Sequence, residues 1–187
     1  MNVIIGVSNR HVHLKEEHLK ELFGENFKLE KFRDLRQPGQ YASNSFVTIK
    51  TDKDKIEKVR IIGPCREYTQ VEISKTDSYK LGINPPIRNS GDLKESVGVT
   101  LIGPNGTLDL EDGCIIPTRH IHLSEEHIKA YGLQGREKVS VVLRGEKGGI
   151  INNVYLKITK DSVLELHLDT DDANAHLIKN GDIGDIL

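Results

Sequence analysis

Short stretches in which apolar and polar residues alternate are spread along the whole 187-residue chain. Several of them are rich in Val, Ile and Thr, which favour strands. Turn signals separate them, as at Gly63-Pro64 and in the glycine-rich segment 145–149. The pattern predicts many short strands, as in barrels or sandwiches, and the clearest cover residues 45–50, 58–62, 69–74, 97–102, 138–143 and 153–159.

Helices are expected to be few and short. Ser124 and Lys15 each precede two consecutive glutamates. This suits a helix N-terminus, because acidic side chains there interact favourably with the positive end of the helix dipole. A third helix is predicted over residues 171–179, ending at Asn180-Gly181.

The chain repeats itself at an offset of 109 residues, so that segment 10–23 aligns with segment 119–132. Two copies are too few for a solenoid, which needs several stacked repeats. We therefore predict a fold that is mainly β with short capping helices, made of two similar β-barrel domains from an internal duplication. The identical pairs are Arg10/Arg119, His11/His120, His13/His122, Leu14/Leu123, Glu16/Glu125, Glu17/Glu126, His18/His127 and Lys20/Lys129.

Composition narrows the class of partners and the cellular setting. A formal net charge of −2 gives no basic field for nucleic acid or an anionic membrane. No apolar run approaches the roughly 18 residues of a membrane span, and the first residues read as a strand rather than a signal peptide, so we expect a soluble protein. Cys65 and Cys114 form no CxxC pair, which favours a reducing cytoplasm over a disulfide framework.

The strongest chemical signal is the histidine pair in each copy, His11-Val12-His13 and His120-Ile121-His122. In a strand, residues i and i+2 project from one face, so both imidazoles can bind one metal ion. On a helix they would point about 200° apart. A single such pair also fits ordinary surface histidines, but its duplication at matching positions favours metal binding.

Two histidines per copy need a further ligand, because zinc takes four protein ligands in structural sites and three plus an open position in catalytic ones. His167, in an alternating strand-like run, is one candidate, and Glu72 is another. Either could instead be an ordinary strand residue. His18, His127 and His176 are interpreted as solvated residues on helix surfaces.

Four segments together resemble the phosphate propanoyltransferases (phosphotransacylases) of the PduL type: Ser8 to Leu14, Gly63 to Glu72, Arg119 to Ser124 and His167 to Ala175. The resemblance covers essentially the whole chain. It implies two β-barrel domains, a dinuclear zinc site between them, and the conversion of acyl-CoA and phosphate into acyl phosphate and CoA.

The resemblance also implies roles for individual residues. One zinc is expected at His11, His13 and Glu72, and the other at His120, His122 and His167. Arg66 matches the arginine that meets phosphate. The expected contacts to coenzyme A are Ser8, Arg60 and Asn174, with Arg33 as a fourth.

A swapped chain path and a homodimer are further implications of the resemblance. Residues 1–9 and 118–187 would form one barrel, and residues 10–117 the other. Members destined for microcompartments carry an additional N-terminal helical peptide, whereas this sequence starts at the first strand, so encapsulation is not expected.

Direct transfer of the acyl group to phosphate fits a sequence without a Gly-x-Ser-x-Gly nucleophile elbow. A covalent route through Cys65 stays open, since the neighbouring Arg66 could lower the pKa of the thiol. Two other classes also stay open: a zinc-dependent thioester hydrolase, in which bound water attacks, and a non-enzymatic metal-binding shell protein, which would leave Arg66 and His167 without a role.

Overall fold

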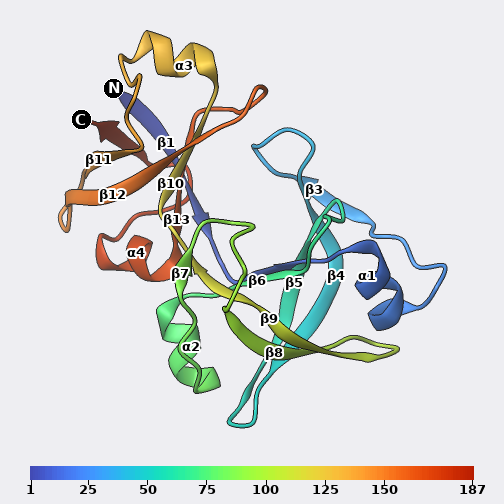
Figure 1. Cartoon of the computed structure of the whole chain (residues 1–187). Coiled ribbons are helices and arrows are strands. Elements are labelled where there is room, and N and C mark those ends of the chain that lie inside the picture. Colours follow the sequence, from blue (N-terminus) through green and yellow to red (C-terminus); the bar gives the residue numbers. More distant parts are fainter. The chain divides into compact units, whose positions relative to one another are not determined.

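The computed structural model describes residues 1–187, which divide into two compact units. Unit 1 consists of Met1–Asn9 and Thr118–Leu187, and unit 2 consists of Arg10–Pro117. Figure 1 labels most of their elements, which are numbered in chain order. The assignment of these units as duplicated domains stays a prediction.

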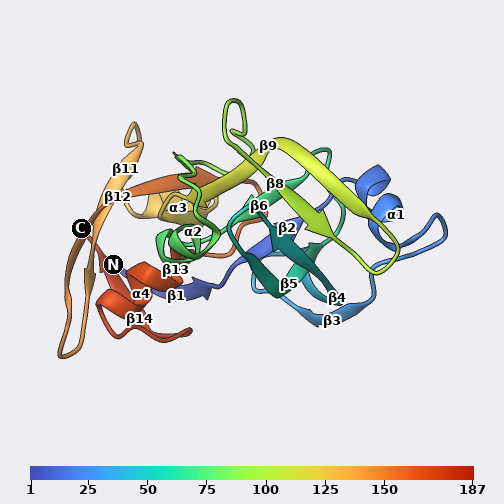
Figure 2. The same cartoon turned by 90° about the horizontal axis from the view of Figure 1, so that it is seen from below.

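Unit 2 contains a closed ring of six strands. Going round the ring, β4 pairs with β5, β5 with β2, β2 with β6, β6 with β9, β9 with β8, and β8 with β4 again. In Figure 2, strands β2, β5, β4 and β3 can be followed side by side. The elements of this unit are β2 (His11–His13), α1 (Glu16–Phe23), β3 (Lys31–Asp34), β4 (Tyr41–Lys50), β5 (Lys55–Gly63), β6 (Gln70–Glu72), α2 (Lys75–Leu81), β7 (Ile87–Arg88), β8 (Val97–Ile102) and β9 (Thr107–Pro117).

Unit 1 closes a second barrel in the order β1-β13-β10-β12-β11-β14. Its first strand, β1, pairs in parallel with β13 and antiparallel with β14, although both partners lie near the end of the chain. The elements are β1 (Asn2–Ser8), β10 (His120–Leu123), α3 (Glu125–Ala130), β11 (Lys138–Leu143), β12 (Gly149–Ile158), β13 (Glu165–Asp169), α4 (Thr170–Ala175) and β14 (Ile183–Ile186).

The two barrels have the same strand pairing. In each, the histidine strand lies between one parallel neighbour, β5 or β12, and one antiparallel neighbour, β6 or β13. The antiparallel neighbour also has a parallel partner on its other side. This partner is β9 for β6 and β1 for β13. The predicted fold class, mainly β with short capping helices and two barrels, is confirmed.

Each barrel has its own core, built as the composition suggests from aliphatic side chains. Unit 2 buries Val12, Ile49, Ile61 and Val71 among others, and unit 1 buries Ile5, Ile121, Val141 and Leu166. In the histidine strands and their antiparallel neighbours, Val12, Val71, Ile121 and Leu166 each lie between two polar residues, so the face of these strands that points away from the core carries polar side chains.

The helices of the structure differ from the prediction in two places. Helix α4 ends at Ala175, with His176 at its C-cap, so the predicted continuation to residue 179 is wrong. Helix α2 was not predicted, although Ser74 and Asp77 form a capping box and Gly82 ends the helix in the left-handed region. No helix is both long and apolar enough to cross a membrane.

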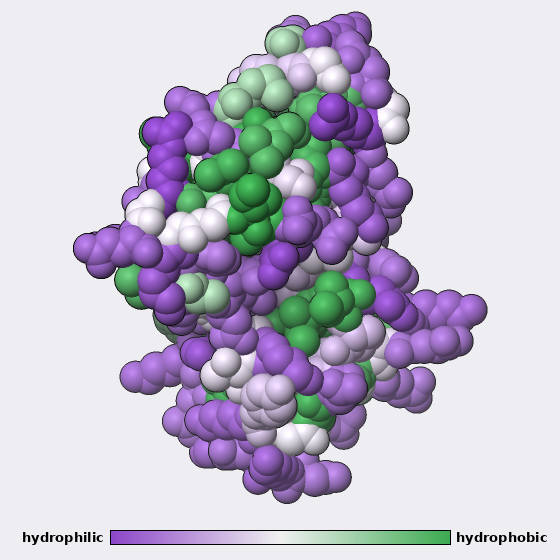
Figure 3. Space-filling model, turned by 90° about the vertical axis from the view of Figure 1, so that its left-hand side faces the viewer, coloured by the Kyte–Doolittle hydropathy of each residue, from purple (hydrophilic) through white to green (hydrophobic).

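The surface is mostly polar, with apolar patches on the face in Figure 3. Over the whole chain the exposed large apolar side chains are Met1, Phe32, Phe46, Tyr79, Ile87, Ile150, Ile158, Val163, Leu177, Ile183 and Leu187.

Candidate active site

Three histidines converge in unit 1. His120 and His122 project from β10, and His167 lies directly opposite His120 on β13. One ligand nitrogen from each lies within 4.8 Å of the others, and the Nε2 atoms of His120 and His122 are 3.1 Å apart. Two ligands of a tetrahedral zinc with bonds of about 2.1 Å are separated by roughly 3.4 Å, so this spacing suits a shared metal ion.

The backbone fixes the tautomer of His120. Its Nδ1–H donates to the carbonyl oxygen of Thr118 at 2.9 Å, because a carbonyl can only accept. In the neutral ring Nε2 then carries the lone pair, as a metal ligand must. Such contacts orient metal-binding histidines.

Two histidines and a glutamate converge in unit 2. His11 and His13 lie on β2, and Glu72 lies opposite His11 on β6. Their ligand atoms also fall within 4.8 Å of one another. The Glu72 carboxylate lies 3.4 Å from His11 Nε2 and 3.9 Å from His13 Nε2, and its side chain is only 10% exposed. A carboxylate this buried requires compensating charge or hydrogen bonds.

Both donor sets fit a catalytic metal ion. Three imidazoles, or two imidazoles and one carboxylate, are ligand sets that hold zinc in enzymes and leave one position open. The same chemistry also suits cobalt and nickel. The structure thus gathers all six predicted ligands into two groups, which we call the three-histidine group (His120, His122, His167) and the glutamate group (His11, His13, Glu72).

Arginine side chains near the motifs fall into two kinds. Arg10 pairs with Asp77 at 2.9 Å, and Arg119 pairs with Asp172 at 2.6 Å, so both charges are neutralised by a carboxylate. The bond to Asp172 raises the pKa of Arg119. Arg66 instead hydrogen-bonds only to hydroxyl groups. Its charge is therefore available for an anion.

The ion pairs of Arg10 and Arg119 were not predicted, although the sequence contains a signal for them. Each arginine immediately precedes its histidine motif, and each aspartate follows Glu72 or His167 by five residues. The pairs tie each histidine strand to the helix after its third ligand.

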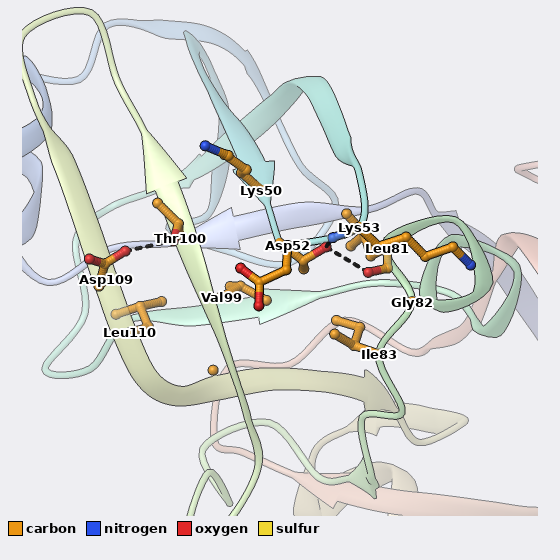
Figure 4. Close-up of a pocket in the computed structure, with 12 residues that line it drawn as sticks. Lys50, Asp52, Lys53, Leu81, Gly82, Ile83, Val99, Thr100, Asp109 and Leu110 are labelled. Atoms are coloured by element: carbon orange, nitrogen blue, oxygen red, sulfur yellow. Dashed lines mark hydrogen bonds between the residues drawn. The ribbon is translucent and has the colours of Figure 1, made fainter.

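A cavity of about 430 Å³ in unit 2 contains none of the predicted site residues (Figure 4). Its charged lining is mixed, with Lys50 and Lys53 beside Asp52 and Asp109, and Asp109 accepts a hydrogen bond from Thr100 at 2.6 Å. Nothing in it matches the chemistry of the two metal groups.

Comparison with known proteins decides the family. The sequence profile of the phosphate propanoyltransferases matches residues 4–179. The chain belongs to the phosphate propanoyltransferase family.

Curated phosphate propanoyltransferases resemble this chain over most of its length. The protein of Thermotoga maritima is 48% identical over 97% of this chain and 87% of its own length. The protein of Priestia megaterium is 47% identical over 97% of this chain and 84% of its own length. The protein of Rhodopseudomonas palustris is 41% identical over 97% of this chain and 80% of its own length. This phosphate propanoyltransferase family member is accordingly an acyltransferase.

The four residues expected to contact coenzyme A lie in different units. Ser8 ends β1 and is half-buried, and Asn174 is exposed on α4. In unit 2, Arg33 is exposed on β3, whereas Arg60 lies beside His11 in the ladder of β2 and β5. The Arg60 guanidinium stacks on Phe46 at 4.4 Å and on Phe32 at 5.1 Å.

All three histidines outside the metal groups are half-buried and have hydrogen-bond contacts, so their interpretation as solvated residues is wrong. His176 Nδ1 donates to the Lys147 carbonyl oxygen at 2.9 Å. His18 Nδ1 lies 2.8 Å from the Thr69 hydroxyl, which links α1 to the start of β6. His127 Nδ1 accepts from the Ser124 backbone N–H at 3.1 Å and so completes a capping box.

Cys65 differs from the reactive cysteine that the covalent route required. Burial and the neighbouring Glu16 raise the pKa of its thiol to about 11, so Arg66 does not lower it. This family member therefore holds Cys65 as a thiol at neutral pH.

Proposed function

We propose that this enzyme interconverts acyl-CoA and phosphate with acyl phosphate and CoA, by direct transfer, with one zinc in each of the two metal groups acting as a dinuclear site. The acyl group is propanoyl or acetyl. The observation that carries the proposal is the pair of three-residue donor sets at matching register positions in the two barrels. Three protein ligands are the number that a catalytic zinc uses when its fourth position is open.

In this reaction a phosphate oxygen attacks the thioester carbonyl carbon, the new C–O bond forms, the C–S bond breaks, and the thiolate of CoA leaves. Zinc in the two groups would supply Lewis acidity and a positive charge for the departing thiolate. Arg66 binds and orients phosphate, since a guanidinium matches two phosphate oxygens at once and no carboxylate competes for it.

The protein's own nucleophiles support direct transfer. Cys65 has a pKa of about 11 and Cys114 one of about 12, both raised first by burial, so neither offers a thiolate at neutral pH. An acyl-enzyme would need another activated nucleophile, and the chain has no Gly-x-Ser-x-Gly elbow.

Coenzyme A is expected to contact Ser8, Arg33, Arg60 and Asn174. Arg60 has the firmest support, because the flanking aromatic rings and a hydrogen bond to the Ser43 carbonyl hold its guanidinium in one orientation beside the strand of His11. A fixed cation of this kind suits a phosphate group of the coenzyme.

A thiol-release assay on propanoyl-CoA and acetyl-CoA, with and without inorganic phosphate, tests the function. We expect release to require phosphate and to yield acyl phosphate. Metal analysis of the same sample should give two zinc ions per chain, and removal of zinc by a chelator should abolish activity. Release at the same rate without phosphate would mean a hydrolase instead, and no turnover of either thioester would mean a binding or shell protein.

A homodimer and a cytoplasmic location stay predictions that rest on the resemblance and on composition. The exposed apolar side chains named above are candidates for an interface. Sedimentation equilibrium of the purified enzyme tests the oligomeric state.

A further inference from the structure

Arg66 is held by weak contacts that use one nitrogen only. Nη1 donates to Ser90 Oγ at 3.2 Å and to Tyr68 Oη at 3.4 Å, and its guanidinium carbon lies 5.9 Å from the centre of the Tyr68 ring. A guanidinium has five N–H donors. The remaining three, on Nε and Nη2, are not engaged by the protein, so Ser90 and Tyr68 position the group without using its capacity to bind an anion.

Gln70 also holds the Ser90 hydroxyl in place, through a second hydrogen bond. This side chain is fully buried, and its amide oxygen accepts from the Gly91 N–H at 2.7 Å. Its amide nitrogen donates to the Glu72 carboxylate and to Ser90 Oγ, the latter at 2.9 Å. Because Gly91 can only donate and a carboxylate only accept, these contacts define which end of the amide is nitrogen.

Ser90 therefore receives two N–H donors, one from Gln70 and one from Arg66. A serine hydroxyl has two lone pairs and one hydrogen. With both lone pairs occupied by groups that cannot accept, the hydrogen has to be donated elsewhere. Ser90 is half-buried, in the loop after β7, so an external group can reach it.

We propose that Ser90 is a further substrate-binding residue, which donates its hydroxyl hydrogen to an oxygen of the same phosphate that Arg66 binds. This inference rests on the proposed role of Arg66. An O–H donor beside a cationic fork suits a phosphate dianion, since hydrogen bonds to charged oxygens are short and strong. Gln70 is then a positioning residue that links this hydroxyl to the metal ligand Glu72.

Two Ser90 variants test the inference in the zinc-loaded enzyme. Ser90→Ala should lower kcat/KM for phosphate by about 10- to 100-fold, the range for one hydrogen bond to a charged group. The KM for propanoyl-CoA should change less than about twofold. Ser90→Thr keeps the hydroxyl and should recover most of the loss.

Ser96→Ala is the matched control. The Ser96 hydroxyl donates to the Leu93 carbonyl at 2.6 Å and accepts from the Gly113 N–H at 2.7 Å. Both of these hydrogen bonds are to the protein backbone, so the residue has a structural role. Its loss should lower the melting temperature and leave the KM for phosphate unchanged.

Binding of inorganic phosphate gives a readout that does not depend on turnover. Phosphate should raise the melting temperature of wild type and Ser96→Ala, and raise that of Ser90→Ala only at a tenfold or higher concentration. If Ser90→Ala does not fold, Ser90→Cys, with its weak donor, replaces it in both measurements.

The outcomes separate this inference from the proposed function. Phosphate-dependent thiol release in wild type, with equal phosphate KM and equal thermal response in Ser90→Ala, would overturn the role of Ser90 alone. Phosphate-independent release in wild type would overturn the proposed function, and the thermal response would still decide whether Ser90 binds phosphate.

Discussion

Glu72 and His167 occupy equivalent positions, because each lies opposite the first histidine of its own barrel's motif, His11 or His120. The residues two places earlier, Gln70 and Glu165, are equivalent as well. Here the carboxylate is in unit 1, whereas at the later position it is in unit 2. Gln70 lies opposite His13 and hydrogen-bonds to Glu72, whereas Glu165 lies opposite His122 and lies 2.9 Å from His167 Nε2. The two barrels thus share the geometry of these positions, but their predicted ligand sets differ in charge.

This difference in charge predicts different functions for the two groups. We expect the glutamate group to take the coenzyme thiolate and the three-histidine group to present phosphate. His13→Ala should then reduce kcat/KM for CoA, and His122→Ala that for phosphate, each by about tenfold or more. Zinc per chain is measured in both variants. One zinc in each variant with identical defects toward both substrates would show that the two metals act as one unit.

Arg66 and Arg10 form a matched pair of substitutions in unit 2. Arg66→Ala should lower kcat/KM for phosphate about 100-fold or more, because paired charge-assisted hydrogen bonds are lost. It should change the unfolding free energy little, since Arg66 has no carboxylate partner. Arg10→Ala should instead lower the unfolding free energy by about 1–3 kcal/mol, because Asp77 is left buried without its cation.

Steady-state kinetics and urea unfolding of both arginine variants separate these effects. An Arg66→Ala enzyme with unchanged phosphate kinetics would contradict the assignment.

Gly6 provides the space in which His167 and Glu165 lie. It is the parallel neighbour of His167, and a Cβ atom there would come within 2.8 Å of Glu165 Oε1 and 3.2 Å of His167 Cδ2. Gly6→Ala should therefore displace this ligand and weaken zinc binding in unit 1 by roughly tenfold or more, as substitutions around metal ligands do.

Gly149→Ala in the same unit is the control, since its nearest contact would be 3.5 Å from His176. Zinc affinity is measured by competition with a chromophoric chelator. Equal affinities in the two alanine variants would contradict the steric role of Gly6.

Cys65 should be a slow thiol. With a pKa raised to about 11, its thiolate fraction at pH 8 is roughly 100-fold below that of an ordinary cysteine, and it should rise about tenfold per pH unit until pH approaches 11. Alkylation by iodoacetamide, followed by peptide mapping between pH 7 and 10, measures this. Cys65→Ser should keep full phosphate-dependent activity, and its inactivity would restore the covalent route.

The sequence predicted the strands and both metal groups better than the contacts around them. The histidine pairs are local, so a period of two sufficed to place His11 with His13 and His120 with His122 on one face. Glu72 and His167 were candidates because their segments alternate, and only the register of β6 and β13 brings them opposite the motifs.

The remaining features depend on long-range pairing, which a local pattern does not encode. Ser90 lies in a loop without periodicity, and its link to Gln70 and Arg66 exists only once that loop packs beside β6. The ends of helices were also poorly predicted, since α4 stops where His176 leaves the helical conformation and not at the glycine further on. Helix α2 has a capping signal but is too short to show apolar periodicity.

The position of β1 sets an order of events during synthesis. All six strands of the barrel in unit 2 fall within residues 10–117, so this barrel can close while the ribosome is still translating. Strand β1 is synthesised before the barrel of unit 2, whereas its partners β13 and β14, which include Glu165 and Asp185, are synthesised after that barrel. At a synthesis rate of about 5–20 residues per second, β1 is without these partners for roughly ten to thirty seconds. During that time its unpaired backbone edges can bind chaperones or pair with the wrong strand.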